Sequence, residues 1–219
     1  MKKYAILVAG GNGSRMGLEL PKQFLLLKGK PVLMHTIEVF SSIDSIQIIV
    51  VLPSNQIGYW KTLCQEYKFN IPIQLVDGGE TRFHSVKNAL TLVDENTLVA
   101  IHDGVRPLIS KEIIAVSFSV ANEKGNAVTC VALKDSIRQT NHDSNQSVNR
   151  SNYFLIQTPQ TFKSDLIKSA YNNSKHTNFT DDASVLEEAG NEIFLIDGDY
   201  KNIKITTADD MLIAEALTK

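Results

Sequence analysis

Residues 4–17 read YAILVAGGNGSRMG, an apolar run that enters a glycine cluster without a break. The basic start and apolar run resemble a secretory leader, but the run lasts only to Ala9, so a buried first strand over Tyr4–Val8 fits better. Glycines directly after a strand permit positive φ angles and let backbone N–H groups converge on an anion. We therefore expect a strand followed by a turn that either binds an anion or serves only as a tight turn.

Strand and helix patterns alternate along most of the remaining chain. Runs of apolar or β-branched residues predict further strands at residues 46–52, 71–76, 98–101, 127–133, 153–156, 192–196 and 202–205. Helical spacing of apolar residues between them implies right-handed βαβ crossovers and a mostly parallel sheet. We expect a three-layer, Rossmann-like α/β fold in which the glycine loop, Pro53-Ser54 and His102-Asp103 follow strands at the edge where ligands bind.

One polar segment, residues 134–152, interrupts this alternation. Its centre, residues 141–145, is a cluster of turn formers flanked by two stretches that could pair as a hairpin. A long arm that leaves a compact domain is more often functional or a dimerisation element than inert. We predict one domain over residues 1–219 with an arm at about 134–152.

Composition excludes several classes of protein. The chain has 219 residues, is 43% hydrophobic and carries a net charge of −2, which does not fit a disordered chain. It has no apolar run of about 18 residues for a membrane span, and it lacks the basic excess of a non-specific nucleic-acid binder. Cys64 and Cys130 lie far apart without paired spacing, so we expect a reduced cytoplasmic protein with no structural zinc.

The glycine loop does not match the common nucleotide-binding fingerprints. A dinucleotide motif that starts at Gly11 meets Met16 where its third glycine belongs, and no Walker loop exists. Two cations instead flank the turn, Arg15 within it and Lys22 seven residues later. Backbone donors with two such cations suit a triphosphate that lies across the loop.

The loop is one of several motifs that point to a known family. The string from Leu7 to Gly17, with Leu20-Pro21-Lys22-Gln23, resembles the signature of sugar-nucleotide and polyol-phosphate nucleotidyltransferases. Further motifs follow in that family's order: Asp77-Gly78-Gly79-Glu80-Thr81-Arg82, Ser85-Val86, His102-Asp103-Gly104-Val105-Arg106-Pro107, Gln157-Thr158-Pro159-Gln160, Thr180-Asp181-Asp182-Ala183 and Asn202-Ile203-Lys204-Ile205-Thr206. Over residues 3–217 the chain resembles the 2-C-methyl-D-erythritol 4-phosphate cytidylyltransferases of the non-mevalonate isoprenoid pathway.

Two sequence features give opposite indications about which polyol phosphate accepts the cytidylyl group. The Ala9-Gly10-Gly11 form is common in the related ribitol-5-phosphate cytidylyltransferases, whereas residues 180–187 resemble the methylerythritol enzymes. The resemblance implies transfer of a cytidylyl group from CTP to 2-C-methyl-D-erythritol 4-phosphate, with release of pyrophosphate. Ribitol 5-phosphate is the alternative acceptor. A non-catalytic scaffold is disfavoured, because the chain keeps the cations Arg15, Lys22 and Lys204 together with Asp103.

The chemistry of this reaction is mainly electrostatic. The attacking phosphate oxygen is already ionised, so no general base is needed, but two anions must approach each other. We expect Lys22 to stabilise the α-phosphate and Arg15 the leaving phosphates, and the resemblance adds Lys204 from the other side. The resemblance also implies Mg²⁺ bridging phosphate oxygens; no protein ligand for it is certain, although Asp103 is a candidate. Lys204 could instead be the outward residue of a strand, and Asp103 a turn former.

The family pattern assigns the remaining site residues. The predicted contacts to the substrates are Ala9, Gly10, Gly11, Gly13, Gly79, Glu80, Ser85, Asp103, Arg106, Arg150 and Thr180. The residues that match the family's cytidine contacts are Ala9, Gly10, Gly79, Glu80 and Ser85. The charge of Glu80 could also interact favourably with the dipole of the helix that follows it. Arg106 more plausibly supports its loop, with a substrate contact in addition. Arg150 is expected to reach the active site of a second subunit and Thr180 to bind the same phosphate, which predicts a homodimer through the arm. The alternative is that Arg150 is a solvated charge.

Overall fold

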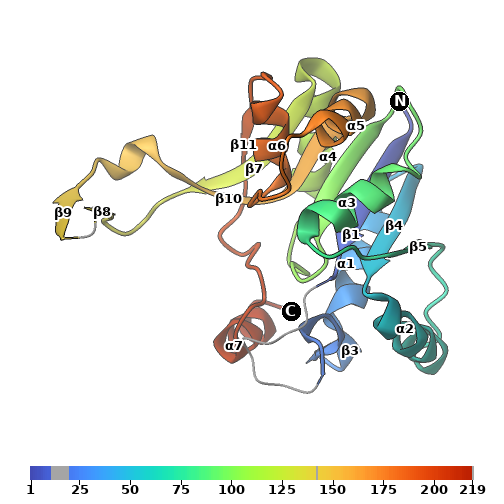
Figure 1. The fold of residues 1–219 in the computed structure, drawn as a ribbon. Helices are drawn as coiled ribbons and strands as arrows, with labels where there is room; N and C mark the ends of the chain where they lie inside the picture. The colour runs from blue at the N-terminus through green and yellow to red at the C-terminus, as the bar shows by residue number, and fades with distance from the viewer. Residues whose placement is uncertain (11–19, 142, 219) are drawn as a thin grey trace.

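The computed structural model describes residues 1–10, 20–141 and 143–218 (Figure 1). A seven-stranded sheet lies at its centre, in the order β11-β7-β10-β6-β1-β4-β5. The strands are β1 (Lys3–Val8), β4 (Ile46–Leu52), β5 (Gln74–Asp77), β6 (Leu98–Asp103), β7 (Asn126–Ala132), β10 (Phe154–Lys163) and β11 (Leu195–Asp197). Neighbouring strands are parallel except at β10, which runs antiparallel to β6 and β7. The predicted mostly parallel α/β sheet is therefore confirmed.

Helices cover both faces of the sheet and make three layers (Figure 1). Side chains alternate along β1, so that Ala5 and Leu7 face one core while Tyr4 and Ile6 face the other. The first core includes residues of α1 (Val32–Ser41), α2 (Ser54–Glu66) and α4 (Lys111–Lys124). The second includes residues of α3 (Arg82–Leu90), α5 (Ser164–Asn173) and α6 (Asp182–Glu188).

A smaller unit lies below the sheet in the view of Figure 1. It consists of η2 (Lys22–Phe24), the short strands β2 (Leu26–Leu27) and β3 (Lys30–Pro31), and α7 (Ala208–Leu217). Leu27 and Val32 pack there against Ile205 and Ala214, which links both ends of the chain. Thr207 caps α7, since Thr207 and Asp210 form a capping box. No helix among the described residues is long and apolar enough to cross a membrane.

The register of β1 brings three strand ends together. Val8 pairs with Val51 of β4 on one side and with Asp103 of β6 on the other. The loops after these strands therefore start from one edge of the sheet, as the sequence predicts. This carboxyl edge carries the site described below.

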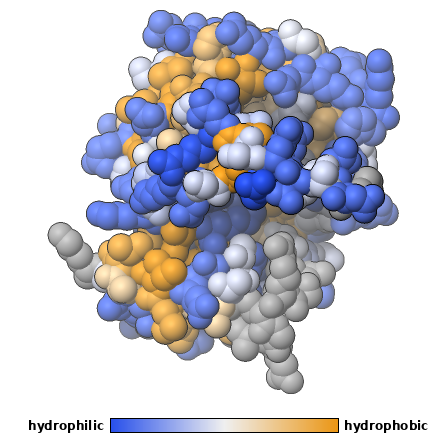
Figure 2. Space-filling view, turned by 90° about the vertical axis from the view of Figure 1, so that its left-hand side faces the viewer, coloured by the Kyte–Doolittle hydropathy of each residue, from blue (hydrophilic) through white to orange (hydrophobic). Residues whose placement is uncertain are grey.

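The predicted arm is a two-stranded hairpin that projects from the sheet (Figure 1). It consists of β8 (Arg138–Asn141) and β9 (Ser144–Ser147), which pair antiparallel and whose residues are all exposed. A short turn, η3 (Arg150–Asn152), leads back to β10. Figure 2 looks at the side of the molecule from which the arm projects, where hydrophilic residues dominate and an apolar patch lies lower down, at the height of α7.

Several of the predicted strands differ from the structure. The strand predicted at 192–196 begins only at Leu195 and ends at Asp197, as β11. The strand predicted at 202–205 is wrong: this stretch is a loop, whose Ile205 N–H donates to the carbonyl of Val105 (2.9 Å) rather than to a sheet strand. The strand predicted at 71–76 begins only at Gln74, after Pro72, which lacks a backbone donor. The strand predicted at 153–156 continues as β10 to Lys163, because a register shift between Ile156 and Gln160 accommodates Pro159 inside the strand.

Candidate active site

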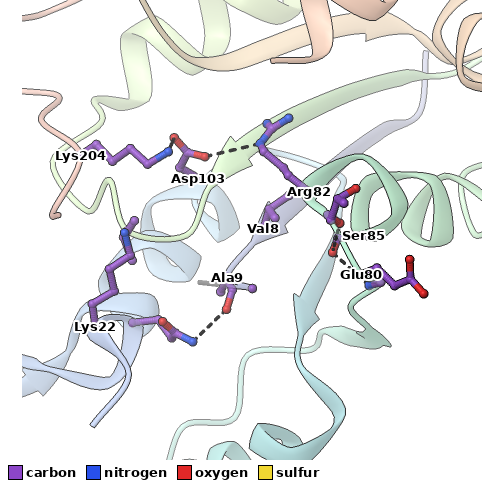
Figure 3. Close-up of a pocket in the computed structure, with 13 residues that line it drawn as sticks. Val8, Ala9, Lys22, Glu80, Arg82, Ser85, Asp103 and Lys204 are labelled. Carbon is purple, nitrogen blue, oxygen red and sulfur yellow. Dashed lines mark hydrogen bonds and ion pairs between the residues drawn. The ribbon is translucent and has the colours of Figure 1, made fainter. Parts of the chain in front are cut away.

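The first cleft opens at the carboxyl edge of the sheet and has a volume of about 290 Å³ (Figure 3). It is lined by Val8, Ala9, Gly10, Lys22, Gln23, Gly79, Glu80, Thr81, Arg82, Ser85, Asp103, Val105 and Lys204. Lys22 and Lys204 lie on one side of it, and Glu80 and Ser85 on the other. The cleft thus gathers the five residues predicted to contact cytidine, two of the three predicted catalytic cations and Asp103.

One wall of the first cleft is the turn that leads into α3. Ser85 Oγ accepts from the N–H of Gly79 (3.0 Å) and donates to the carbonyl of Thr81 (2.9 Å), which fixes the turn. Gly79 must be glycine, because a Cβ there would lie 2.3 Å from Cβ of His84. Thr81 caps α3, and Glu80 lies one residue before this cap with an exposed side chain. The wall therefore presents backbone polar groups and one carboxylate to the cleft.

The opposite wall is held by a glutamine that the sequence analysis quoted without a role. The buried Gln23 side-chain amide donates to the carbonyl of Ala9 (2.9 Å) and to Oε1 of Gln56 (2.6 Å). This ties η2, and with it Lys22, to the end of β1. Its place directly after Lys22 in the Pro-Lys-Gln motif is the signal that could have identified it.

Asp103 is the centre of a cation cluster, which we call the Asp103 junction. Its carboxylate lies 3.1 Å from Nζ of Lys204, 3.1 Å from Nε of Arg106 and 3.9 Å from Nε of Arg82. The residue is 7% exposed. Burial alone raises the pKa of the Asp103 carboxyl, but Lys204, Arg82 and Arg106 outweigh burial and hold that pKa well below its usual range. Asp103 is therefore ionised at neutral pH and surrounded by positive charge.

A second cleft, of about 360 Å³, adjoins the first across this junction. It is lined by Arg82, Asp103, Arg106, Ile156, Gln157, Thr158, Gln160, Thr180, Asp181, Ser184 and Lys204. Arg82, Asp103 and Lys204 line both clefts. Two ligands that met at the junction would each contact the same charged side chains.

The N-terminus of α6 forms one wall of the second cleft. Oε1 of Gln160 accepts from the N–H groups of Asp182 (3.0 Å) and Ala183 (2.8 Å), and its amide donates to Asp181 (2.9 Å). Thr180 precedes this cap and lines the cleft, as the prediction for a phosphate donor requires. Gln160 lies 22 residues before Asp182, so no local pattern could have connected them.

Arg106 and His102 connect the junction to neighbouring loops and strands. Arg106 Nη1 donates to the carbonyl of Asn202 (2.7 Å), which joins the loop after β6 to the loop that carries Lys204. His102 is fully buried, with Nδ1 3.0 Å from Oγ1 of Thr158. Burial lowers the pKa of His102 to about 4, so the ring is neutral at pH 7. These contacts agree with a structural role for His102.

The remaining predicted residues lie elsewhere. Arg150 is exposed in η3, where its guanidinium contacts the carbonyl of Lys134, and it lines neither cleft of its own subunit. Gly11, Gly13 and Arg15 lie outside the described residues. The sequence analysis missed Arg82, although its motif was quoted, and missed its partner Asp182.

The donor groups at the junction fit a cation that is held mainly by its ligand. Among the residues that the structure describes, no group of three or more His, Cys, Asp or Glu side chains could hold a metal ion. The first cleft does contain two carboxylates, Glu80 and Asp103. Mg²⁺ in nucleotide sites usually keeps several waters and binds one or two carboxylates together with phosphate oxygens. The cleft fits that mode of binding and does not fit a closed protein cage.

Comparisons with known proteins give consistent results. Residues 4–219 match the family model described as IspD: 2-C-methyl-D-erythritol 4-phosphate cytidylyltransferase. Proteins of that name from Azobacteroides pseudotrichonymphae and Phocaeicola vulgatus are 50% and 48% identical to this chain; the alignments cover 99% of it and 98% and 100% of those proteins. The crystal structure of 4-diphosphocytidyl-2C-methyl-D-erythritol synthase from Anaerococcus prevotii has a TM-score of 0.86 and 29% identity, with 98% of this chain and 95% of that chain covered.

Proposed function

This chain belongs to the 2-C-methyl-D-erythritol 4-phosphate cytidylyltransferase family, and we propose how its two clefts divide the reaction of that family. The reaction is cytidylyl transfer to 2-C-methyl-D-erythritol 4-phosphate in isoprenoid biosynthesis, with CTP as the donor. Ribitol 5-phosphate is not favoured as the acceptor, because the similar proteins are named for the methylerythritol substrate.

The shared lining of the two clefts carries this proposal. Lys204, Asp103 and Arg82 face both, so a bond between two ligands would form beside them. CTP occupies the first cleft, where the turn at Gly79 and the backbone at Ala9 read the cytosine edge. The polyol phosphate occupies the second cleft, with Thr180 at its phosphate and Asp103 at its hydroxyls.

The transfer step is a displacement at the α-phosphorus of CTP. An ionised phosphate oxygen of the acceptor forms the new P–O bond, and the bond to pyrophosphate breaks without any proton transfer. Lys22 and Lys204 stabilise the negative charge that builds on the α-phosphate, because fixed cations in a low-dielectric site are effective there. Arg15 neutralises the leaving pyrophosphate. Asp103 holds Lys204 in place through an ion pair, and Arg106 holds Asp103 through another.

Mg²⁺ is proposed as the cofactor. When bound to the phosphates it supplies further neutralisation of their charge. Asp103 and Glu80 are the carboxylates of the first cleft that would hold it from the protein side. Asp103 is the better candidate because it lies between the two clefts.

The arm is proposed to form a homodimer and to complete the second cleft. Four consecutive apolar residues at its root, Tyr153, Phe154, Leu155 and Ile156, are each more than 40% exposed. Leu212 and Ile213 of α7 are exposed as well. Exposed apolar groups gathered in this way are typical of interaction surfaces. A symmetric dimer would cover them and bring Arg150 to the partner's acceptor phosphate.

A cytoplasmic location is proposed from the thiols. Cys64 and Cys130 are free, and Cys130 is buried. Burial raises the pKa of both thiols, which lowers the fraction present as the reactive thiolate. Unpaired, inert cysteines are typical of proteins in a reducing compartment.

Pyrophosphate release, measured with each nucleoside triphosphate against each polyol phosphate, tests the function. We expect release with CTP and 2-C-methyl-D-erythritol 4-phosphate, dependent on Mg²⁺. Activity only with ribitol 5-phosphate would overturn the acceptor. No release with any pair would overturn the enzyme function and leave a nucleotide-binding scaffold.

A further inference from the structure

Arg82 lies in the wall between the two clefts, in a position to which the sequence analysis gave no role. It is the first residue of α3, directly after the turn of the first cleft, and it also lines the second cleft. Its side chain is 26% exposed and lines both clefts, at the place where the two ligands would meet. In Figure 3 it lies above Val8, with its Nε directed toward Asp103.

A buried carboxylate holds this guanidinium from behind. Arg82 Nη1 and Nη2 donate to the two oxygens of Asp182 at 2.8 and 2.6 Å, a bidentate pair that fixes the plane of the guanidinium. The side chain of Asp182 is fully buried, and its Oδ1 also accepts from the hydroxyl of Tyr171 (2.6 Å). Tyr171 in turn stacks on Phe83, with ring centroids 4.6 Å apart. The chain Tyr171–Asp182–Arg82 thus connects α5, α6 and α3.

The distances at the junction indicate what this anchor does. Arg82 Nε lies 3.9 Å from Asp103, whereas Lys204 and Arg106 approach the same carboxylate to 3.1 Å. Without Asp182, Arg82 could swing to Asp103, since both are already within ion-pair range. It would then compete with Lys204 and withdraw from the ligand-facing wall. The hydrogen bonds found for the Asp182 carboxylate among the described residues come from Arg82 and Tyr171, so the effect of removing its charge is expected to act through these two side chains.

We propose that Arg82 is a further substrate-binding cation, shared by both clefts, and that Asp182 and Tyr171 are positioning residues that hold it between the two phosphates. The inference rests on the proposed function. A residue that served one cleft alone would affect one substrate. A cation in the shared wall affects both substrates, and its displacement also slows the transfer step.

The test uses Asp182→Asn in the full-length protein, since asparagine keeps the shape and one acceptor oxygen but removes the charge. The rate of pyrophosphate release is measured against CTP and against 2-C-methyl-D-erythritol 4-phosphate, well below the thermal unfolding midpoint of each variant. We expect kcat/KM to fall about tenfold or more for both substrates, because small displacements of a positioning group are costly. Asp182→Glu restores most of the activity, whereas Tyr171→Phe lowers kcat/KM for both substrates by a smaller factor.

Asp94→Asn is the matched control. It removes an ion pair of similar length, Lys2–Asp94 at 2.6 Å, at an exposed site that lines neither cleft among the described residues. We expect its kinetics to equal those of the wild type. Should Asp182→Asn fail to fold, Tyr171→Phe decides, because it keeps the ring that stacks on Phe83.

Two results would overturn the inference alone while the wild type is active. The first is a folded Asp182→Asn variant whose kcat/KM values for both substrates stay within twofold of the wild type. If Asp182→Asn does not fold, the same result for Tyr171→Phe has the same meaning. The other is a loss confined to one substrate. A wild type that releases no pyrophosphate would instead overturn the proposed function, and this inference with it.

Discussion

The Asp103 junction and the arm use charge in opposite ways. At the junction each side chain is fixed by partners from distant parts of the chain: Arg106 by Asn202, and Arg82 by Asp182, which lies 100 residues further on. In the arm, the strands β8 and β9 are exposed throughout, and Arg138 and Arg150 contact groups of the arm and its root.

This difference indicates which parts of the site a single chain can complete. The junction is preorganised, since its ion pairs exist before any ligand arrives, and such fixed charges need no rearrangement during the reaction. The arm has no comparable support among the described residues, so its arginine acquires a function only against another surface. The proposed enzyme therefore builds the nucleotide cleft and the cation cluster in one subunit and borrows Arg150 from the next.

The largest effect is expected at the junction, from Lys204→Ala. We expect kcat to fall by about 100- to 1000-fold, the range for removal of one transition-state stabilising group. Asp103 keeps Arg106 and Arg82 as partners, so the variant is expected to fold. Pyrophosphate release at saturating substrates measures the change.

Lys201→Ala is the control for that variant, because Lys201 is exposed and lines neither cleft among the described residues. A Lys204→Ala enzyme with kcat within a factor of about three of the wild type would contradict a catalytic role for Lys204. It would leave Lys204 with a structural role only, as the ion-pair partner of Asp103.

A smaller, selective effect is expected in the arm, from Arg150→Ala. The KM for 2-C-methyl-D-erythritol 4-phosphate should rise about 10- to 100-fold, since one charge-assisted contact to the phosphate is lost. The KM for CTP should stay unchanged. Arg138→Ala, also in the exposed arm, is the matched control.

An unchanged KM for the polyol phosphate in Arg150→Ala would remove the arm from the active site. The two regions would then be independent, and Arg150 would be one more solvated charge. An equal rise in both KM values would indicate a general loss of structure instead.

Local patterns predicted most of the fold, whereas most of the candidate site residues were predicted from the family resemblance. The apolar run of Ile46–Leu52 has the bounds of β4, because buried parallel strands are continuous apolar runs, whereas β6 extends the strand predicted at 98–101 as far as Asp103. The alternation Asn-Ile-Lys-Ile-Thr around Lys204 suggested a strand, but tertiary contacts hold it as a loop: the Asn202 side chain donates to the carbonyl of Thr158. Alternation shows which side chains face inward, and it does not show whether a neighbouring strand is available.

The contacts of Arg82 could not be predicted in the same way. Its carboxylate partner is remote in sequence, and both residues lie in the first turn of a helix, where charged side chains are also common on protein surfaces. Gln160 and Gln23 are similar cases, since a buried glutamine is identified only by the groups that surround it. Long-range pairing of polar side chains is thus the part of this site that single-sequence reasoning does not reach.

The last effect is on stability and leaves activity aside, and it concerns His102, which packs beneath the junction. The pKa of His102 is about 4 in the folded protein, below its ordinary value of about 6.5. As the pH falls from about 6.5 to 4, this imidazole therefore becomes protonated in the unfolded chain while it stays neutral in the folded protein. Stability should therefore decrease over that window by about 3 kcal/mol from this group. The carboxyl of Asp103 contributes little in that window, because the unfolded chain protonates this group mostly below about pH 4; its lowered folded pKa then costs further stability below that pH.

Urea unfolding of the wild type and of His102→Asn, at several pH values between about 4 and 7, measures this share. We expect the variant to be less stable at pH 7 and to lose less stability on acidification. An identical pH dependence for the two proteins would show that His102 is not a buried neutral ring.

Complementation between two impaired variants tests the composite site most directly. Lys204→Ala damages the junction and Arg150→Ala the arm, so a mixed dimer holds one site with both defects and one intact site. After the two variants are mixed, unfolded and refolded together, half of the dimers are mixed. At a low concentration of the polyol phosphate, we predict that activity rises to about a quarter of the wild-type value, well above the mean of the two variants refolded separately. Activity that stays at that mean would contradict the account, because Arg150 would then serve its own subunit or no active site at all.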